Sequence, residues 1–259
     1  MSDYQLDNPQ DLLEAQVKLR GSLDGSMSIW WLKATQYAAV DCVLTPLYNL
    51  LNASFQKFKA IDETKYEITM LELAYFADLE SGEALSSFIN PFTGKTGTPP
   101  PAIFGPNRVS LTTDGLQPPE NFPFGTLTFS GGLGPGYTDG KDVWVREDTL
   151  VEMESDNPAF GNYIYNELVT YRGDWAALND RETASIPGYI TYSTTSNWRP
   201  WMMADDTPGN IVSEGYGKKV TRIDELPLDY LKLASQHDPQ VLADPVKLLD
   251  TPPSIPAGD

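Results

Sequence analysis

Residues 65–78 read KYEITMLELAYFAD, and this stretch decides the fold class that the sequence predicts. Tyr66, Ile68 and Met70 alternate with polar residues, which is the period-two pattern of a strand with one wet face. After Met70 the apolar residues change parity, because Leu71 and Leu73 continue the pattern. We therefore predict a strand over residues 65–78 with a bulge or bend near residues 70–71.

Six further segments have the same character, because they are rich in aromatic and β-branched residues and are bounded by Gly, Pro, Asn or Asp. They cover residues 29–37, 54–61, 142–153, 164–172, 189–198 and 211–220. This number of strands in a chain of 259 residues predicts one mainly β domain over residues 1–259. We expect an antiparallel β-barrel of the lipocalin or calycin type, with a two-sheet β-sandwich as the alternative.

The remaining segments predict helices at both ends and a long loop between. Asn8 and Pro9 form a helix start, and an imperfect apolar stripe continues to about Arg20. Residues 224–250 predict short helices broken by Pro239 and Pro245. The Pro- and Gly-rich residues 90–140 predict a long, ordered, irregular loop, and residues 251–259 a loose tail.

Charge and composition exclude several classes of partner. The chain has 18 basic and 36 acidic residues, a formal net charge of -18, so we expect binding neither to nucleic acid nor to an anionic membrane surface. We see no secretory signal and no apolar run long enough to span a membrane. These observations predict a soluble cytoplasmic protein and leave the oligomeric state open, with a homodimer as one possibility.

Conventional catalytic groups are scarce. His237 and Cys42 are the only histidine and the only cysteine, which excludes a His-rich metal site and a CxxC centre. Phosphate-binding loops and nucleophile-elbow motifs are missing as well. We therefore predict no metal and no cofactor, and we look for chemistry among carboxylates, tyrosines, arginines and tryptophans.

The strand around residues 164–172 carries the candidate acid and base. Alternation places Glu167 and Tyr171 on one face, and that face would offer a carboxylate and a phenol for proton transfer if it lined a cavity. The alternative is that this face is exposed or hydrogen-bonded for structural reasons. Glu72 raises the same question, because a buried Glu72 would be either paired with an arginine such as Arg20 or functional.

Aromatic clusters supply the candidate binding residues. In Trp198-Arg199-Pro200-Trp201, Arg199 could hold a carboxylate or carbonyl oxygen, and the same residues could instead plug one end of a barrel. We name Glu167, Tyr171 and Arg199 as candidate catalytic residues. The candidate substrate-binding residues are Trp30, Tyr37, Glu72, Tyr75, Trp198 and Trp201.

An ordered set of short motifs resembles one known family. The motifs are residues 17–25 (VKLRGSLDG), 45–47 (TPL), 90–94 (NPFTG), 166–167 (NE), 198–201 (WRPW) and 226–227 (LP). Together they resemble the bacterial and fungal family known as domain of unknown function 1838, and the resemblance runs nearly the full length of the chain. It implies relatives but assigns no activity and no catalytic residue.

These observations favour a cofactor-independent enzyme of secondary metabolism, a cyclase, isomerase or lyase that acts on an apolar polyketide or terpenoid, possibly in a pericyclic reaction. This hypothesis rests on the aromatic content, the number of predicted strands and a chain length sufficient to enclose a ligand. The first alternative is a non-catalytic carrier of a hydrophobic small molecule. The second is an interaction module that binds through residues 90–140.

Overall fold

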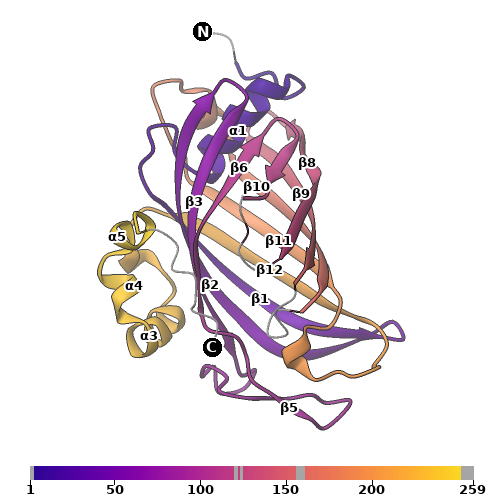
Figure 1. Ribbon diagram of the computed structural model, residues 1–259. Coiled ribbons are helices and arrows are strands. Elements are labelled where there is room, and N and C mark those ends of the chain that lie inside the picture. The colour runs from indigo at the N-terminus through magenta and orange to yellow at the C-terminus, as the bar shows by residue number, and fades with distance from the viewer. Residues whose placement is uncertain (1–2, 120–121, 123–124, 156–160, 252–259) are drawn as a thin grey trace.

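The computed structural model describes residues 3–119, 122, 125–155 and 161–251 (Figure 1). The strands are β1 (Ser28–Val40), β2 (Val43–Asp62), β3 (Lys65–Ala77), β4 (Phe88–Ile89), β5 (Thr96–Gly97), β6 (Ile103–Thr112), β7 (Gly115–Gln117), β8 (Thr126–Thr138), β9 (Asp142–Glu154), β10 (Tyr163–Asp174), β11 (Gly188–Ser196) and β12 (Asn210–Val220). The helices are α1 (Pro9–Arg20), α2 (Trp175–Asn179), α3 (Leu228–His237), α4 (Pro239–Ala243) and α5 (Pro245–Leu249), with 3-10 turns at η1 (Pro200–Met202) and η2 (Ile223–Glu225).

Ten strands form one antiparallel sheet that curls into a nearly closed barrel (Figure 1). The strand order is β7-β6-β3-β2-β1-β12-β11-β10-β9-β8. The ends of the sheet meet where β7 approaches β8, and a Cβ added to Gly115 would lie 3.0 Å from the Cα of Gly132. A side chain at position 115 would crowd this approach, and Gly115 also has a positive φ of 98°. The barrel prediction is confirmed, and the sandwich alternative is excluded.

Helix α1 closes one end of the barrel from within. Asn8 caps it as predicted, because its side chain accepts hydrogen bonds from the backbone N–H groups of Gln10 and Asp11. Leu13 and Val17 pack against β2, β3 and β6, while Leu12 and Leu19 pack against β9 and β10. A helix between two walls is buried on most sides, which explains why its apolar stripe is imperfect.

The C-terminal helices α3–α5 cover the outside of β1–β3 (Figure 1). Leu71, Leu73 and Tyr75 point outward into this layer and pack against helix residues such as Tyr230 and Leu233. The change of apolar parity in residues 65–78 therefore does not come from a bulge in β3. It arises because the outer face of β3 becomes covered, and the register shift opposite residues 70–72 lies in β6, between Phe104 and Asn107.

The prediction of a long irregular loop over residues 90–140 is wrong. Most of this segment forms β5, β6, β7 and β8, and β6 and β8 are full barrel strands. Glycines obscure the strand pattern in β8, where Gly131 and Gly134 have φ values of 138° and 98° and the register with β9 shifts between Leu133 and Gly136. The glycine-rich sequence is thus an irregular strand rather than a loop.

Two other expectations concern the end of the chain and the membrane. Short helices after residue 223 are confirmed by α3, α4 and α5. The predicted tail over residues 251–259 lies outside the described residues, apart from Thr251. Within the described part of the chain, no helix combines the length and the apolar character that crossing a membrane requires.

Candidate active site inside the barrel

The inner face of β10 carries the predicted acid and base. Odd-numbered residues of β10 are buried or half-buried, whereas the even-numbered ones are mostly exposed. Val169 and Tyr171 pack with Leu19 of α1 and with Trp30, so the odd-numbered face points into the barrel. Glu167 and Tyr171 therefore lie on the inner wall, as the alternation requires.

An ion pair lies in the centre of the interior. Arg20, the last residue of α1, donates from Nη1 to Glu147 Oε1 at 2.6 Å and from Nε to Gln56 Oε1 at 3.1 Å. The side chains of Arg20 and Glu147 are only 6% and 2% exposed. Burial acts to lower the pKa of Arg20, but the surrounding acidic groups, chiefly Glu147, together raise it above the ordinary value and keep the guanidinium protonated. The same carboxylate accepts from Gln16 at 3.1 Å.

Two further carboxyl groups face this ion pair. Burial, followed by the charges of Glu147 and Glu72, raises the pKa of Glu167 to about 7 against the opposing effects of Arg20 and a Tyr192 hydrogen bond. Burial also raises the pKa of Glu72, and here Arg20 and Asn52 act in the opposite direction. A carboxyl group with a pKa near neutrality can both take and give a proton at physiological pH.

Tyr171 is positioned as a proton donor. Burial raises its pKa well above the ordinary value for a phenol, so its hydroxyl stays protonated at neutral pH. Its ring is held edge-on by Trp30, with centroids 5.4 Å apart, and Trp30 itself is anchored by a hydrogen bond from Nε1 to the Arg20 carbonyl at 2.6 Å. The candidate binding residue Trp30 thus orients both the phenol and the end of α1.

Partial exposure of inward side chains indicates that the interior is not filled. Glu72, Tyr165, Glu167 and Tyr192 are half-buried rather than fully buried, although their strands direct them into the barrel. An inward side chain reaches solvent only through space inside the barrel. The inner wall therefore borders space that solvent reaches.

Two fully enclosed polar atoms beside the carboxylates also lack partners among the described residues. Gln16 is 0% exposed and Thr149 is 4% exposed, yet Gln16 Oε1 and Thr149 Oγ1 make no hydrogen bond there. Thr149 lies directly opposite Glu167 in the β9–β10 register. Buried polar groups are nearly always satisfied, so these atoms mark a position for a polar group of a ligand or for water.

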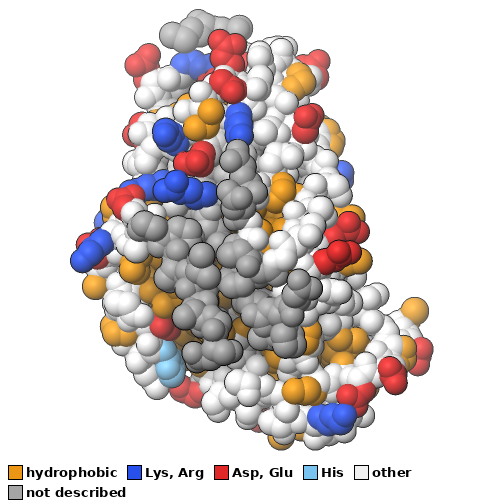
Figure 2. Space-filling model, in the orientation of Figure 1, with side chains coloured by type: hydrophobic (Ala, Val, Ile, Leu, Met, Phe, Trp, Pro, Cys, Tyr) orange, Lys and Arg blue, Asp and Glu red, His pale blue; other side chains and the backbone are white. Residues whose placement is uncertain are grey.

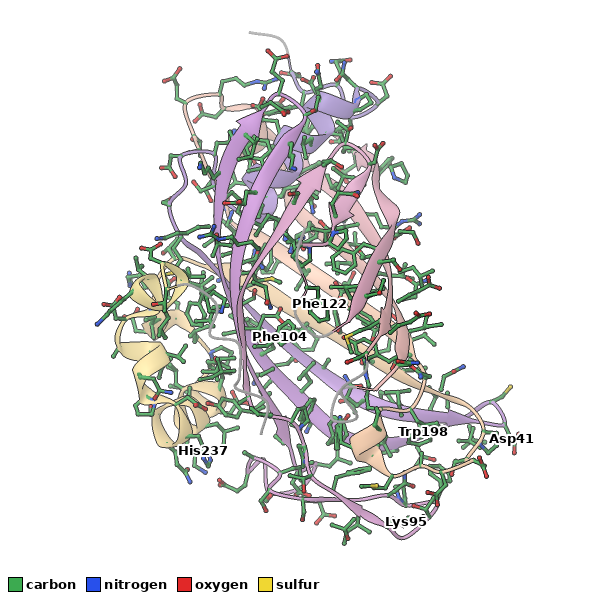
Figure 3. The ribbon with its side chains drawn as sticks, viewed as in Figure 1. Asp41, Lys95, Phe104, Phe122, Trp198 and His237 are labelled. Atoms are coloured by element: carbon green, nitrogen blue, oxygen red, sulfur yellow. The ribbon has the colours of Figure 1, made fainter. Side chains whose placement is uncertain are left out.

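The end of the barrel away from α1 is aromatic. Trp198 and Trp201 pack with Tyr48, Phe76 and Met202, so both tryptophans line this end of the barrel. Figure 3 shows Trp198 at this end. The guanidinium of Arg199 stacks over inward-facing Tyr163 and Tyr165. We call this region the mouth.

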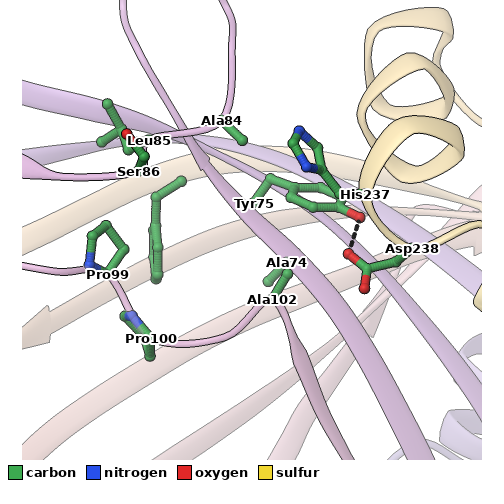
Figure 4. A pocket seen from close by; sticks show the side chains of 11 residues that line it. Ala74, Tyr75, Ala84, Leu85, Ser86, Pro99, Pro100, Ala102, His237 and Asp238 are labelled. Atoms are coloured by element: carbon green, nitrogen blue, oxygen red, sulfur yellow. Dashed lines mark hydrogen bonds between the residues drawn. The ribbon is translucent and has the colours of Figure 1, made fainter.

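Two of the predicted binding residues lie on the outer face. Tyr37 pairs with Val212 on the face opposite to that of buried Ile211, and it is only half-buried. Tyr75 packs on α3 and donates to Asp238 Oδ2 at 2.7 Å, so it contributes to the covering layer (Figure 4). Neither tyrosine reaches the interior carboxylates, and neither belongs to the candidate site.

A surface pocket of about 270 Å³ surrounds Tyr75, His237 and Asp238 (Figure 4). Tyr75 and Asp238 satisfy each other there, and burial followed by the Asp238 carboxylate raises the pKa of the phenol. The Tyr75 hydroxyl and the Asp238 carboxylate are thus engaged with each other in the covering layer, and we place the candidate site inside the barrel. His237, which lines the pocket, is the last residue of α3.

Neither a metal-binding cluster nor a concentrated patch of surface charge marks a second candidate site in the described part of the chain and on the face that Figure 2 shows. No group of three or more His, Cys, Asp or Glu residues is arranged to hold a metal ion in the described ranges. Figure 2 shows acidic side chains spread around the visible face rather than gathered into one patch. The acidity of the chain is thus not concentrated at a single site on that face.

Sequence reasoning missed the two residues at the centre of the site. Arg20 was considered only as a partner of Glu72, and Glu147 was not considered. Glu147 lies on the same face of β9 as Val143 and Val145. A charged residue at an inward position of this apolar series is the sequence signal that could have found it. The pairing of Glu147 with Arg20 joins residues 127 positions apart and had no local signal.

Comparisons with known proteins give one finding. Neither the comparison with curated proteins nor that with solved structures returned a match. The model of a family described as protein of unknown function, DUF1838, matches residues 151–254. This range holds Glu167, Tyr171 and Arg199, whereas Arg20, Glu72 and Glu147 precede it. The match confirms the resemblance to DUF1838 over residues 151–254, whereas the motifs at residues 17–25, 45–47 and 90–94 lie outside the matched range.

Proposed function

We propose that this protein is a cofactor-independent enzyme that isomerises, cyclises or cleaves an apolar small molecule inside its barrel. The single observation that carries the proposal is Glu167, an inward-facing carboxyl group with a pKa of about 7 beside a buried guanidinium. We infer that the substrate is of the polyketide or terpenoid kind and that the reaction takes place in the cytoplasm.

The proposed chemistry is proton transfer next to a carbonyl group. Ionised Glu167 takes a proton from the carbon beside the carbonyl, and the C–H electron pair moves into an enolate. Arg20 Nη2, which has no hydrogen bond among the described residues, stabilises the enolate oxygen. The phenol of Tyr171 donates a proton to that oxygen, which gives an enol. Protonated Glu167 then gives its proton to another carbon while the O–H proton returns to Tyr171, which restores the carbonyl group, the phenol and ionised Glu167.

The barrel also contributes by restricting the substrate. Enclosing a flexible apolar chain between aromatic walls favours reactive conformers and excludes water from the enolate. Tyr165, Tyr192 and Trp30 supply such walls on three different strands. In this proposal Glu72 tunes Glu167, because its negative charge raises the pKa of that group.

Hydrogen–deuterium exchange of a simple ketone tests the proposal without knowledge of the natural substrate. 2-Tetralone, an apolar and enolisable ketone, is incubated with the protein in D₂O, and the loss of its α-proton signal is followed by NMR. We expect the wild type to accelerate exchange and Glu167→Gln to lower the rate at least about 100-fold, the usual contribution of a general base.

Glu152→Gln is the matched control, because Glu152 lies exposed on the outer face of β9. This variant should retain the wild-type exchange rate. Equal rates for the wild type and Glu167→Gln would contradict the proposed role of Glu167. Binding of 2-tetralone without accelerated exchange would favour the carrier instead.

A further inference from the structure

Arg199 reaches the interior of the barrel at the mouth. Its Cζ lies 3.9 Å from the ring centroid of Tyr163 and 5.4 Å from that of Tyr165. Both tyrosines are on the inward face of β10. The positive charge also acts on buried Tyr48 and on Tyr192, opposing the rise in their pKa that burial causes. The guanidinium is therefore inside the wall rather than on the outer surface.

Arg199 has no acidic partner among the described residues. It takes part in none of the ion pairs and in no side-chain hydrogen bond within the ranges that the structure describes. By contrast, Arg20, Arg146, Arg172, Arg181 and Arg222 each pair with a carboxylate. Acidic residues outnumber basic ones two to one, 36 against 18, so an inward guanidinium without a carboxylate is unusual for this chain.

The surroundings of Arg199 suit an anionic group. The aromatic faces hold the planar guanidinium in place but leave its N–H donors without acceptors. Trp198 Nε1, in the same segment, is also buried and has no hydrogen-bond partner in the part of the chain that the structure describes. A carboxylate offers two oxygens to such donors, and its bidentate pairing with arginine is the strongest geometry available to them.

The register of β10 sets the distance from this point to the proposed chemistry. Tyr165 lies beneath Arg199, and Val169 lies opposite Glu147, the partner of Arg20. These positions are four residues apart, or roughly 13 Å along a strand. Glu167 lies between them on the same face. The two guanidiniums therefore mark the two ends of an elongated space.

We propose that the ligand of the barrel is an apolar monocarboxylic acid whose carboxylate binds Arg199 and whose apolar body extends along Tyr165 toward Glu167. This inference rests on the proposed function, since it names the substrate class for the same site. A carboxylate at the mouth fixes the direction in which the chain enters. It also sets which carbon of the chain reaches Glu167.

Matched fatty ligands test this inference. cis-Parinaric acid, whose fluorescence rises in apolar surroundings, serves as the probe, and dodecanoic acid and its methyl ester compete for it. We expect the wild type to bind the acid at least tenfold more tightly than the ester. Arg199→Met should weaken the acid at least tenfold and the ester less than twofold, whereas Arg199→Lys should give an intermediate affinity for the acid.

Arg222→Met is the control, because Arg222 is exposed and pairs with Asp224 outside the barrel. It should change neither affinity. Equal binding of acid and ester by the wild type would overturn the inference, as would an equal loss of both in Arg199→Met, with circular dichroism verifying that each variant is folded. Exchange of neutral 2-tetralone by the wild type needs no carboxylate, so its outcome reports the proposed function separately.

Discussion

The two guanidiniums inside the barrel are held in opposite ways. Arg20 ends α1, is nearly inaccessible and donates to Glu147 and Gln56. Arg199 begins η1 at the mouth, is half-buried and contacts only aromatic rings with its charged group, as far as the described residues show. The first charge is neutralised by the protein, and the second is left for something else to neutralise.

This difference separates a structural charge from a recognition charge. Removing one member of a buried pair leaves the other charge without compensation, so Arg20 contributes to stability whatever else it does. A half-buried guanidinium stacked on tyrosines keeps part of its hydration and loses little when it is unpaired. The comparison predicts that substitutions at the two positions separate effects on stability from effects on binding.

Arg20→Met should give the largest effect on stability. Glu147, 2% exposed, would lose its cationic partner and stay buried, which costs about 3–5 kcal/mol in comparable cases. The free energy of unfolding measured by urea denaturation checks this. The double variant Arg20→Met, Glu147→Leu should recover much of the loss, because it removes both charges together. A surface ion pair contributes less than about 1 kcal/mol. A loss of unfolding free energy that small in Arg20→Met would contradict a buried, stabilising pair between Arg20 and Glu147.

Glu167 should give the next largest effect, as a pH dependence. Its pKa of about 7 in the folded protein is above the ordinary value of 4.5, so the folded state binds the proton more tightly than the unfolded state. Its contribution to stability is therefore complete below pH 4.5 and is lost as the pH rises toward 7. The loss amounts to about 3 kcal/mol for a shift of this size.

The difference in unfolding free energy between the wild type and Glu167→Gln isolates this contribution. The variant should gain stability relative to the wild type between pH 4.5 and pH 7, with little further change above that range. Glu152→Gln, with the same change on the outer face, should show no such trend. A flat difference across this range would show that Glu167 titrates as an exposed carboxyl group does.

The sequence predicts the strands of this fold better than its glycine-rich part. Apolar alternation located the seven predicted strands, because a side chain on one face of a strand reports its own burial. The alternation pattern failed over residues 126–138, because glycines have no side chain whose polarity could indicate burial and because the register with β9 shifts there. The pattern also predicted a bulge near Met70 that β3 does not have, because the sequence does not show that helices α3–α5 cover the outer face of β3.

The candidate site was predictable only strand by strand. Parity placed Glu167 and Tyr171 together because both lie on one strand, and the structure keeps them together. Tyr37 and Tyr75 were grouped with them by composition alone, and parity within their own strands directs them outward. Pairings such as Arg20 with Glu147 depend on where α1 enters the barrel, which no local pattern contains.

Arg199→Met should give the smallest effect on stability and thereby sharpen the comparison. The variant loses cation–π contacts with Tyr163 and Tyr165, worth about 0.5–1 kcal/mol at partly exposed sites, but no carboxylate is left buried and unpaired. Methionine retains apolar contact with both rings, so the net loss should stay below about 1 kcal/mol. Urea denaturation of Arg199→Met and Arg20→Met under the same conditions compares their losses of unfolding free energy directly. A loss as large as that of Arg20→Met would mean that Arg199 already neutralises a charge of the protein, and the mouth would then have no free cation for a ligand.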